Sequence, residues 1–213
     1  MNKASISILT SIFVGLMALV ATPSWAQDNT ATGTIKGKIT VSGARDAENV
    51  VVYIEKAPGE YPAPQQPAQM DQQKLTFTPF VLAIVKGTKV NFLNSDPVLH
   101  NVFWSKSGDG SYPAQNLGTW GKGTSKDFTF DKEGSITLLC NVHPEMESHV
   151  VVLQNPFFAV VGKDGAYEIK GVPPGQYSVK AWYPNPKKLK SKTSAAMVKA
   201  GQEAQLDFSL SRK

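Results

Sequence analysis

One short segment of the chain contains three side chains that are common metal ligands. Cys140, His143 and Met146 follow one another at the spacing C-x2-H-x2-M, which supplies a thiolate, an imidazole and a thioether. Apolar residues before Cys140 and from Val150 onward predict two strands, so the three donors lie on the loop between them. His100, 40 positions before Cys140, precedes another apolar stretch and can supply a fourth donor from a neighbouring strand end. The spacing predicts a site for one metal ion.

The types of donor indicate which metal this is. Two imidazoles and a thiolate in one plane, with a weak thioether above it, form the arrangement of blue-copper sites. Zinc also binds His and Cys, but structural zinc sites rarely include Met. We therefore predict copper. Either of the flanking carboxylates, Glu145 or Glu147, is an alternative that could replace or join Met146, although Met ligation is expected. His149 matches no ligand position and is expected to be a surface or edge-strand side chain.

The start of the chain predicts export. Residues 1–26 combine a positive start and a short apolar run with small residues, Ser24 and Ala26, at the cleavage positions, as in a bacterial secretory signal. The mature protein would begin near Gln27, in the periplasm, and no later segment is long and apolar enough to span a membrane. An exported protein with one cysteine cannot form an internal disulfide, and ligation of a metal would protect the lone thiol of Cys140.

Composition and patterning favour an all-β protein. The 17 Gly and 14 Pro residues punctuate short runs rich in Val, Ile, Phe and Leu, and no stretch of twelve residues between Met70 and Leu153 has helical spacing. Short strands at such intervals predict a sandwich or a barrel. The excess of basic residues gives a net charge of only +5 without an arginine cluster, which argues against nucleic-acid binding and mildly favours acidic partner proteins or an anionic surface.

The Cys140–Met146 segment resembles the copper loop of the cupredoxins, the plastocyanin- and amicyanin-like blue copper proteins. The stretch from Phe77 to Phe103 resembles the matching upstream region of that family. The resemblance implies a Greek-key cupredoxin β-sandwich over residues 70–153. It further implies that Asn101 braces the ligand loop. The copper ligands that it implies are His100, Cys140, His143 and Met146.

The rest of the chain resembles a second family. Residues 164–177 are similar to part of the carboxypeptidase regulatory, transthyretin-like β-sandwich, which implies a second small sandwich over residues 157–211. Residues 33–56 resemble its opening strands, so our hypothesis is that they belong to it, with the cupredoxin inserted beyond a Pro-rich linker at 57–69. The simpler alternative assigns these first strands to the cupredoxin sheet. Pairing between residues 34–41 and the tail would decide between the two.

The expected function is electron transfer. A cupredoxin carries single electrons between redox partners, here a c-type cytochrome or a dehydrogenase, and binds them weakly. A copper-binding module for storage, delivery or sensing is the alternative. An enzyme is not expected, because copper oxidases and nitrite reductases need a second copper centre with several more histidines. After His100 and His143, only His149 remains.

Overall fold

The computed structural model describes residues 31–185 and 188–212, so the signal peptide predicted at 1–26 lies outside the described residues. The described chain is built of strands, which confirms the all-β prediction, and it has no helix that could cross a membrane. The strands are β1 (Gly33–Ser42), β2 (Val51–Ile54), β3 (Ala68–Gln73), β4 (Thr76–Thr78), β5 (Val81–Val85), β6 (Thr88–Asn94), β7 (His100–Trp104), β8 (Gln115–Trp120), β9 (Ser125–Phe130), β10 (Gly134–Leu139), β11 (Glu147–Leu153), β12 (Phe158–Val160), β13 (Ala166–Val172), β14 (Gly175–Trp182), β15 (Lys192–Val198), β16 (Glu203–Gln205) and β17 (Phe208–Ser211).

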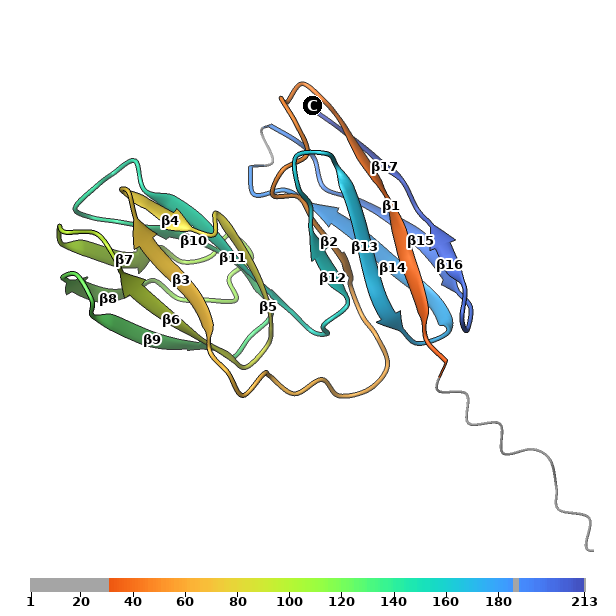
Figure 1. The fold of residues 1–213 in the computed structure, drawn as a ribbon, viewed down its shortest axis with the longest axis horizontal. Helices are drawn as coiled ribbons and strands as arrows, with labels where there is room; N and C mark the ends of the chain where they lie inside the picture. The colour runs from red at the N-terminus through yellow and green to blue at the C-terminus, as the bar shows by residue number, and fades with distance from the viewer. Residues whose placement is uncertain (1–30, 186–187, 213) are drawn as a thin grey trace, which may run out of the picture.

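The strands form two sandwiches that lie side by side (Figure 1). The first consists of the sheets β5-β11-β10-β7-β8 and β4-β3-β6-β9. Its core contains the largest fully buried side chain of the described residues, Trp104, which stacks edge-on against Phe128 with 4.9 Å between ring centroids. Cys140 and Met146 belong to this same core cluster, so the ligand loop continues directly from packed strands.

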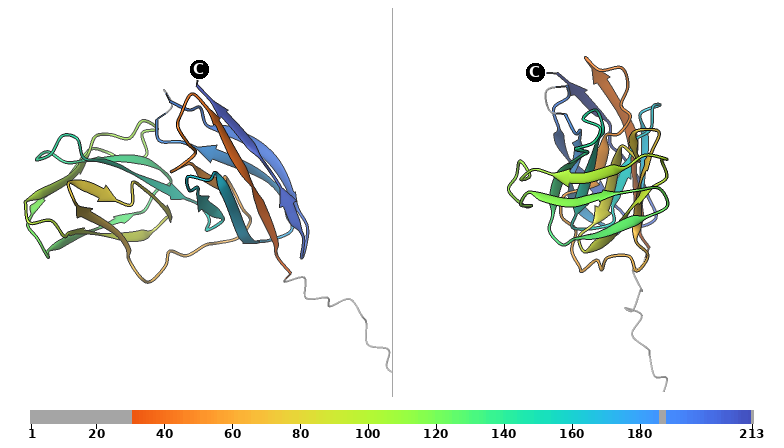
Figure 2. Two further views of the ribbon diagram at one scale, coloured as in Figure 1. Left: turned by 45° about the horizontal axis from the view of Figure 1, so that its top comes forward. Right: turned by 90° about the vertical axis from the view of Figure 1, so that its left-hand side faces the viewer.

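The second sandwich contains strands from both ends of the chain. β1 pairs antiparallel with β13 and parallel with both β16 and β17, and β2 pairs antiparallel with β12 and β14. The two further views show β1 lying among the last strands of the chain (Figure 2). This is the pairing that the insertion hypothesis requires. The division of the chain into folding domains, and the carboxypeptidase regulatory type of this sandwich, stay predictions, because pairing shows which strands adjoin and not which segments fold together.

A third apolar cluster joins the two sandwiches. It consists of Val51, Val81, Val151 and Leu153, from β2, β5 and β11. Strand side chains alternate between the two faces of a sheet, so the neighbours of these residues point into the two sandwich cores: Val150 and Val152 pack into the first core and Val52 and Ile54 into the second. Apolar runs without alternation, such as VVVYI and VVVL, are the expected pattern for strands buried on both faces.

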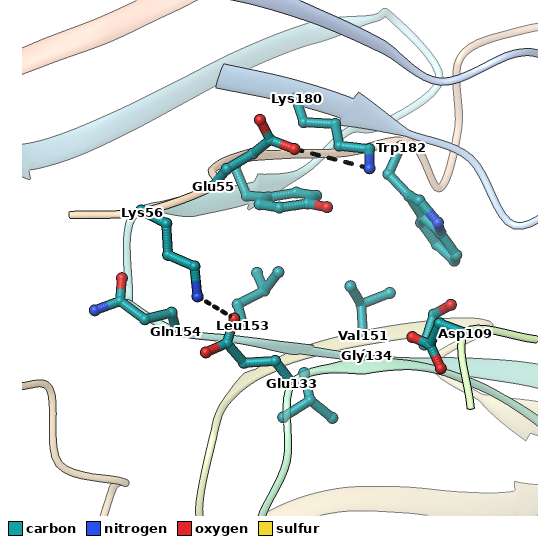
Figure 3. Close-up of a pocket in the computed structure, with 13 residues that line it drawn as sticks. Glu55, Lys56, Asp109, Glu133, Gly134, Val151, Leu153, Gln154, Lys180 and Trp182 are labelled. Atoms are coloured by element: carbon teal, nitrogen blue, oxygen red, sulfur yellow. Dashed lines mark hydrogen bonds and ion pairs between the residues drawn. The ribbon is translucent and has the colours of Figure 1, made fainter. Parts of the chain in front are cut away.

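Charged groups line the edge of this junction. A cavity of about 370 Å³ opens between the sandwiches, and two ion pairs cross or border it, from Lys56 to Glu133 at 2.7 Å and from Lys180 to Glu55 at 3.8 Å (Figure 3). Burial and the nearby carboxylates Glu55 and Glu133 raise the pKa of Tyr53 in its wall to about 12. Each of the two lysines in this wall therefore faces a carboxylate of the same chain.

Four strands were not predicted from the sequence. Polar or small residues dominate β3 (AQMDQQ), β8 (QNLGTW) and β15 (KTSAAMV), and β4 has only three residues. These segments are extended because a partner strand satisfies their backbone groups: β3 pairs in parallel with β6, for example, from Ala68 opposite Val90 to Gln72 opposite Asn94. Pairing with strong strands overrides weak local propensity.

Candidate metal centre

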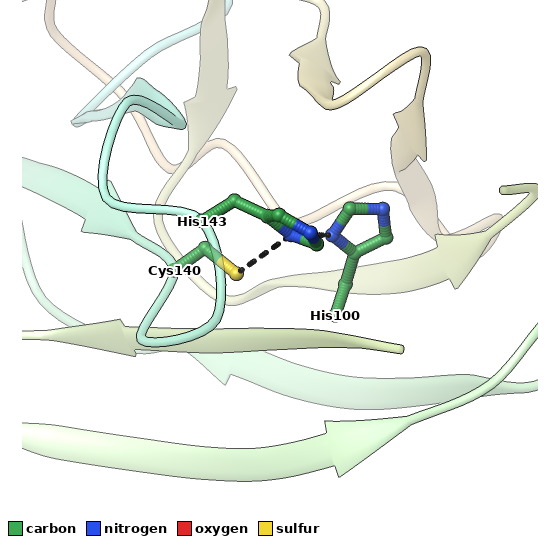
Figure 4. A group of neighbouring side chains, drawn as sticks. All are labelled: His100, Cys140 and His143. Atoms are coloured by element: carbon green, nitrogen blue, oxygen red, sulfur yellow. Dashed lines mark hydrogen bonds between the residues drawn. The ribbon is translucent and has the colours of Figure 1, made fainter. Parts of the chain in front are cut away.

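Three of the four predicted ligands converge at one end of the first sandwich. His100 is the first residue of β7, Cys140 follows the last residue of β10, and His143 lies on the loop to β11. One donor atom from each lies within 4.8 Å of the others (Figure 4). The Nδ1 atoms of the two histidines are 3.0 Å apart, and the Cys140 Sγ is 4.0 Å from Nδ1 of His143. Metal–nitrogen and metal–sulfur bonds of about 2.0–2.3 Å fit donors at this spacing, so the residues fit one ion.

The two imidazoles differ in their access to solvent. His100 is fully buried, whereas His143 is half-buried among the exposed loop residues Val142 and Pro144. Their rings are tilted by 58° with centroids 4.7 Å apart. The centre therefore has one donor that is sealed inside the protein and one whose ring reaches the surface.

The sulfur of Cys140 is held by the neighbouring strand. Cys140 is 3% exposed, and the backbone N–H of Asn101 donates to its Sγ at 3.4 Å. The Asn101 side chain donates to Asn116 Oδ1 at 2.9 Å and to the Gly118 carbonyl at 2.7 Å, and it accepts from the N–H of Asn141 at 3.4 Å. These contacts connect Asn101 to Cys140 and to Asn141, the two residues at the start of the ligand loop.

Met146 ends the loop and is buried with 1% exposure in the same core cluster as Cys140. Its N–H donates to the His143 carbonyl at 3.0 Å, which closes the loop as a tight turn. Neither Glu145 nor Glu147 belongs to the convergent group, and both are exposed. Glu147 is paired instead with His149, at 3.1 Å. Of the candidates for a further ligand, only Met146 is buried.

The expectation that His149 is a surface or edge-strand residue is wrong. His149 is 5% exposed on β11, between β5 and β10. Its ring lies 5.3 Å from that of Phe80 and 6.3 Å from that of Trp182, which the second sandwich contributes. Burial lowers its pKa, although the nearby Glu147 carboxylate opposes this shift. The sequence did not reveal this burial because a distant segment covers the strand.

Sequence reasoning missed one charged residue beside the centre. Asp96, in the loop between β6 and β7, is 7% exposed, and its Oδ2 lies 2.9 Å from Nε2 of His100. Burial disfavours its charged form. Hydrogen bonds from the N–H groups of Leu75 and Lys74 and from the His100 ring outweigh that cost, so the pKa of the Asp96 carboxyl lies below its usual value. Its position four residues before a candidate ligand was the available signal.

Comparisons with known proteins cover the segment that contains this site. Residues 65–153 match the family described as copper binding proteins, plastocyanin/azurin family. No curated protein sequence matches the chain. Similar solved structures include a reduced Cu(I) form of an amicyanin variant at pH 4 and an oxidised amicyanin variant, each 24% identical, covering 47% of this chain and 97% of the other, with a TM-score of 0.38. The family match identifies residues 65–153 as a copper-binding segment of the plastocyanin/azurin family.

Proposed function

We propose that this protein is a periplasmic electron carrier in which His100, Cys140, His143 and Met146 bind a single copper ion. The observation that carries the proposal is the convergence of two imidazole nitrogens and one sulfur within 4.8 Å at one end of a β-sandwich. Copper bound by such a donor set cycles between Cu(I) and Cu(II) and so carries one electron. Export through the predicted signal at 1–26 would bring the protein to the periplasm.

The half-buried ring of His143 offers the route for the electron. Large apolar side chains are exposed beside the centre: Val142 is the residue before His143, and Leu99 is the residue before His100. Val98 and Leu75 add further exposed apolar surface: Val98 lies in the loop that precedes His100, and the backbone N–H of Leu75 donates to Asp96 in that loop. A small apolar surface around a redox ligand suits brief encounters with a partner, since such interfaces bury little area. A c-type cytochrome or a dehydrogenase is the partner we propose.

Among the described residues, one group of three or more His, Cys, Asp or Glu side chains could hold a metal ion. A single one-electron centre suits a carrier of single electrons, which is the function that we propose. Storage, delivery or sensing is the outcome that the experiment below separates from electron transfer.

The test is to load the mature protein with Cu(II), record its visible spectrum and then mix its reduced form with oxidised c-type cytochromes in a stopped-flow instrument. We expect one copper per chain, an intense thiolate-to-copper band that Cys140→Ser abolishes, and rapid oxidation by at least one cytochrome. Met146→Leu should alter this band, since Met146 is the fourth proposed ligand. Met197→Leu is its matched control, because Met197 is 57% exposed on β15 and should leave the band unchanged. A colourless protein that binds only zinc would refute the assignment, and a blue protein that exchanges no electrons would indicate storage or delivery.

A further inference from the structure

A buried carboxylate lies directly behind the innermost proposed ligand. Asp96 is 7% exposed, and three donors point at its two oxygens. Oδ1 accepts the Lys74 N–H at 2.6 Å, and Oδ2 accepts the Leu75 N–H at 2.8 Å and lies 2.9 Å from Nε2 of His100. A carboxylate that faces only donors acts purely as an acceptor. Electron transfer itself assigns no role to this residue.

The turn that Asp96 holds has an unusual conformation. Lys74 and Leu75 connect β3 to β4 as a two-residue hairpin turn, and both have φ at +56°. Such turns normally contain Asn or Gly, since a positive φ costs other residues about 1–2 kcal/mol each. Here the Asp96 carboxylate accepts both N–H groups of the turn, which offsets that cost. The same carboxylate therefore holds an exposed turn and a buried imidazole in one fixed arrangement.

The loop that carries Asp96 is itself fixed. The Asp96 N–H donates to Oδ1 of Asn94 at 2.9 Å. The buried Asn94 amide donates in turn to the carbonyls of Val98 and Trp120, each at 2.9 Å. The carboxylate is therefore positioned from both sides of the loop, and it cannot rotate away from His100 without breaking several buried hydrogen bonds.

The contact with Asp96 determines which nitrogen of His100 is free. Because the carboxylate only accepts, Nε2 of His100 must carry the hydrogen, and Nδ1 keeps its lone pair. That lone pair lies on the side of His143, whose Nδ1 is 3.0 Å away. A neutral His100 ring held in this tautomer can accept the hydrogen bond between the two rings from His143.

We propose that Asp96 is the positioning residue of the metal centre, fixing His100 as an Nδ1 donor before any metal binds. The proposal rests on the proposed function in that it takes His100 as a ligand. A carboxylate behind the ring also makes the imidazole a stronger donor and favours the higher charge of Cu(II), which lowers the reduction potential of the site. The structure thereby links the exposed turn at Lys74 and Leu75 to the inner ligand through one side chain.

Asp96→Asn tests this proposal because it replaces one acceptor oxygen by an NH2 donor. The amide cannot accept from His100 Nε2 and from both turn N–H groups as the carboxylate does, so a share of His100 should change to the Nδ1–H tautomer. Imidazole 15N shifts of the copper-free protein report the tautomer directly. For copper, we expect the dissociation constant to rise about 10- to 100-fold and the reduction potential to rise.

Asp109→Asn is the matched control. Asp109 also accepts a backbone N–H, from Ser111 at 3.0 Å. It lies in the loop that follows β7, whereas His100 is the first residue of that strand. It should leave both the tautomer and the copper affinity unchanged. Asp96→Glu keeps the negative charge and should show the wild-type tautomer of His100. If Asp96→Asn does not fold, the 15N spectra of Asp96→Glu test whether the carboxylate fixes the His100 ring.

The result that would overturn the proposal is an Asp96→Asn protein that keeps the Nε2–H form and binds copper within twofold of the wild type. An Asp96→Glu protein that loses the Nε2–H form would overturn it as well. Failure of the proposed function looks different: the wild type itself would bind no copper, while the spectra of the metal-free protein would still report whether Asp96 fixes the ring.

Discussion

Replacing Asn101 by Ala should uncouple the ligand loop from the strand beside it. Asn101 is 2% exposed. Its side chain donates hydrogen bonds to Asn116 at 2.9 Å and to the Gly118 carbonyl at 2.7 Å, and it accepts a longer one from the Asn141 N–H at 3.4 Å. Each good bond contributes about 1 kcal/mol net, and buried partners left unsatisfied add to the loss. Asn101→Ala should therefore lower the free energy of unfolding of the copper-free protein by about 2–3 kcal/mol, measured by urea denaturation.

The control for this prediction is Asn91→Ala. The Asn91 amide also makes two hydrogen bonds, at 2.9 Å to Ser125 and 2.6 Å to Asp127, but in exposed positions where water can replace it. We expect that variant to lose about 0.5 kcal/mol. The Asn101 contact to the Cys140 sulfur comes from the backbone, so Asn101→Ala should keep the visible band. If the two Ala variants are equally stable, the interpretation of Asn101 as a brace is wrong.

Two further substitutions test the fold around the site. His149→Gln should change the pH dependence of stability. Burial lowers the pKa of His149, so near pH 6.5 the unfolded chain takes up a proton that the folded chain does not. In urea titrations, the free energy of unfolding of the wild type should therefore fall relative to that of the variant as the pH drops below about 6.5. Parallel pH curves would contradict this. Gly37→Ala would place a Cβ 1.9 Å from the Leu206 carbonyl oxygen. Thermal unfolding should show that the variant loses more than about 2 kcal/mol of its free energy of unfolding. A melting temperature equal to that of the wild type would refute this account of β1 packing.

The sequence predicted the metal-binding end of the fold better than its surroundings. Cys140 and His143 lie close together along the chain. His100 joins them because the start of β7 and the end of the neighbouring antiparallel strand β10 lie at the same end of the sheet. Asp96 was missed because an acidic residue in a loop is ordinarily a solvated one. Its role depends on the turn at Lys74 and Leu75, which belongs to strands that were not predicted.

The junction of the two sandwiches left a signal in the sequence that strand propensity alone could not interpret. Along β11, Val150 and Val152 pack into one core, while Val151 and Leu153 pack into another. A strand with one face in water would alternate apolar and polar residues, so an uninterrupted apolar run indicates that both faces are covered. The run at residues 150–153 could have predicted a second layer on this sheet. It could not have shown that distant segments supply the layer, because pairing partners lie outside any local pattern.

The position of that junction bears on the metal centre. β11 begins one residue after Met146, so the strand that leaves the ligand loop is the one packed between two cores. At the other end of the loop, Cys140 follows β10, which pairs with β11 from Gly134 to Leu139, and its sulfur accepts the N–H of Asn101. Both ends of the loop are therefore fixed by packing that needs no metal. A site whose donors are held in this way changes little between oxidation states, which is the property that rapid electron transfer requires.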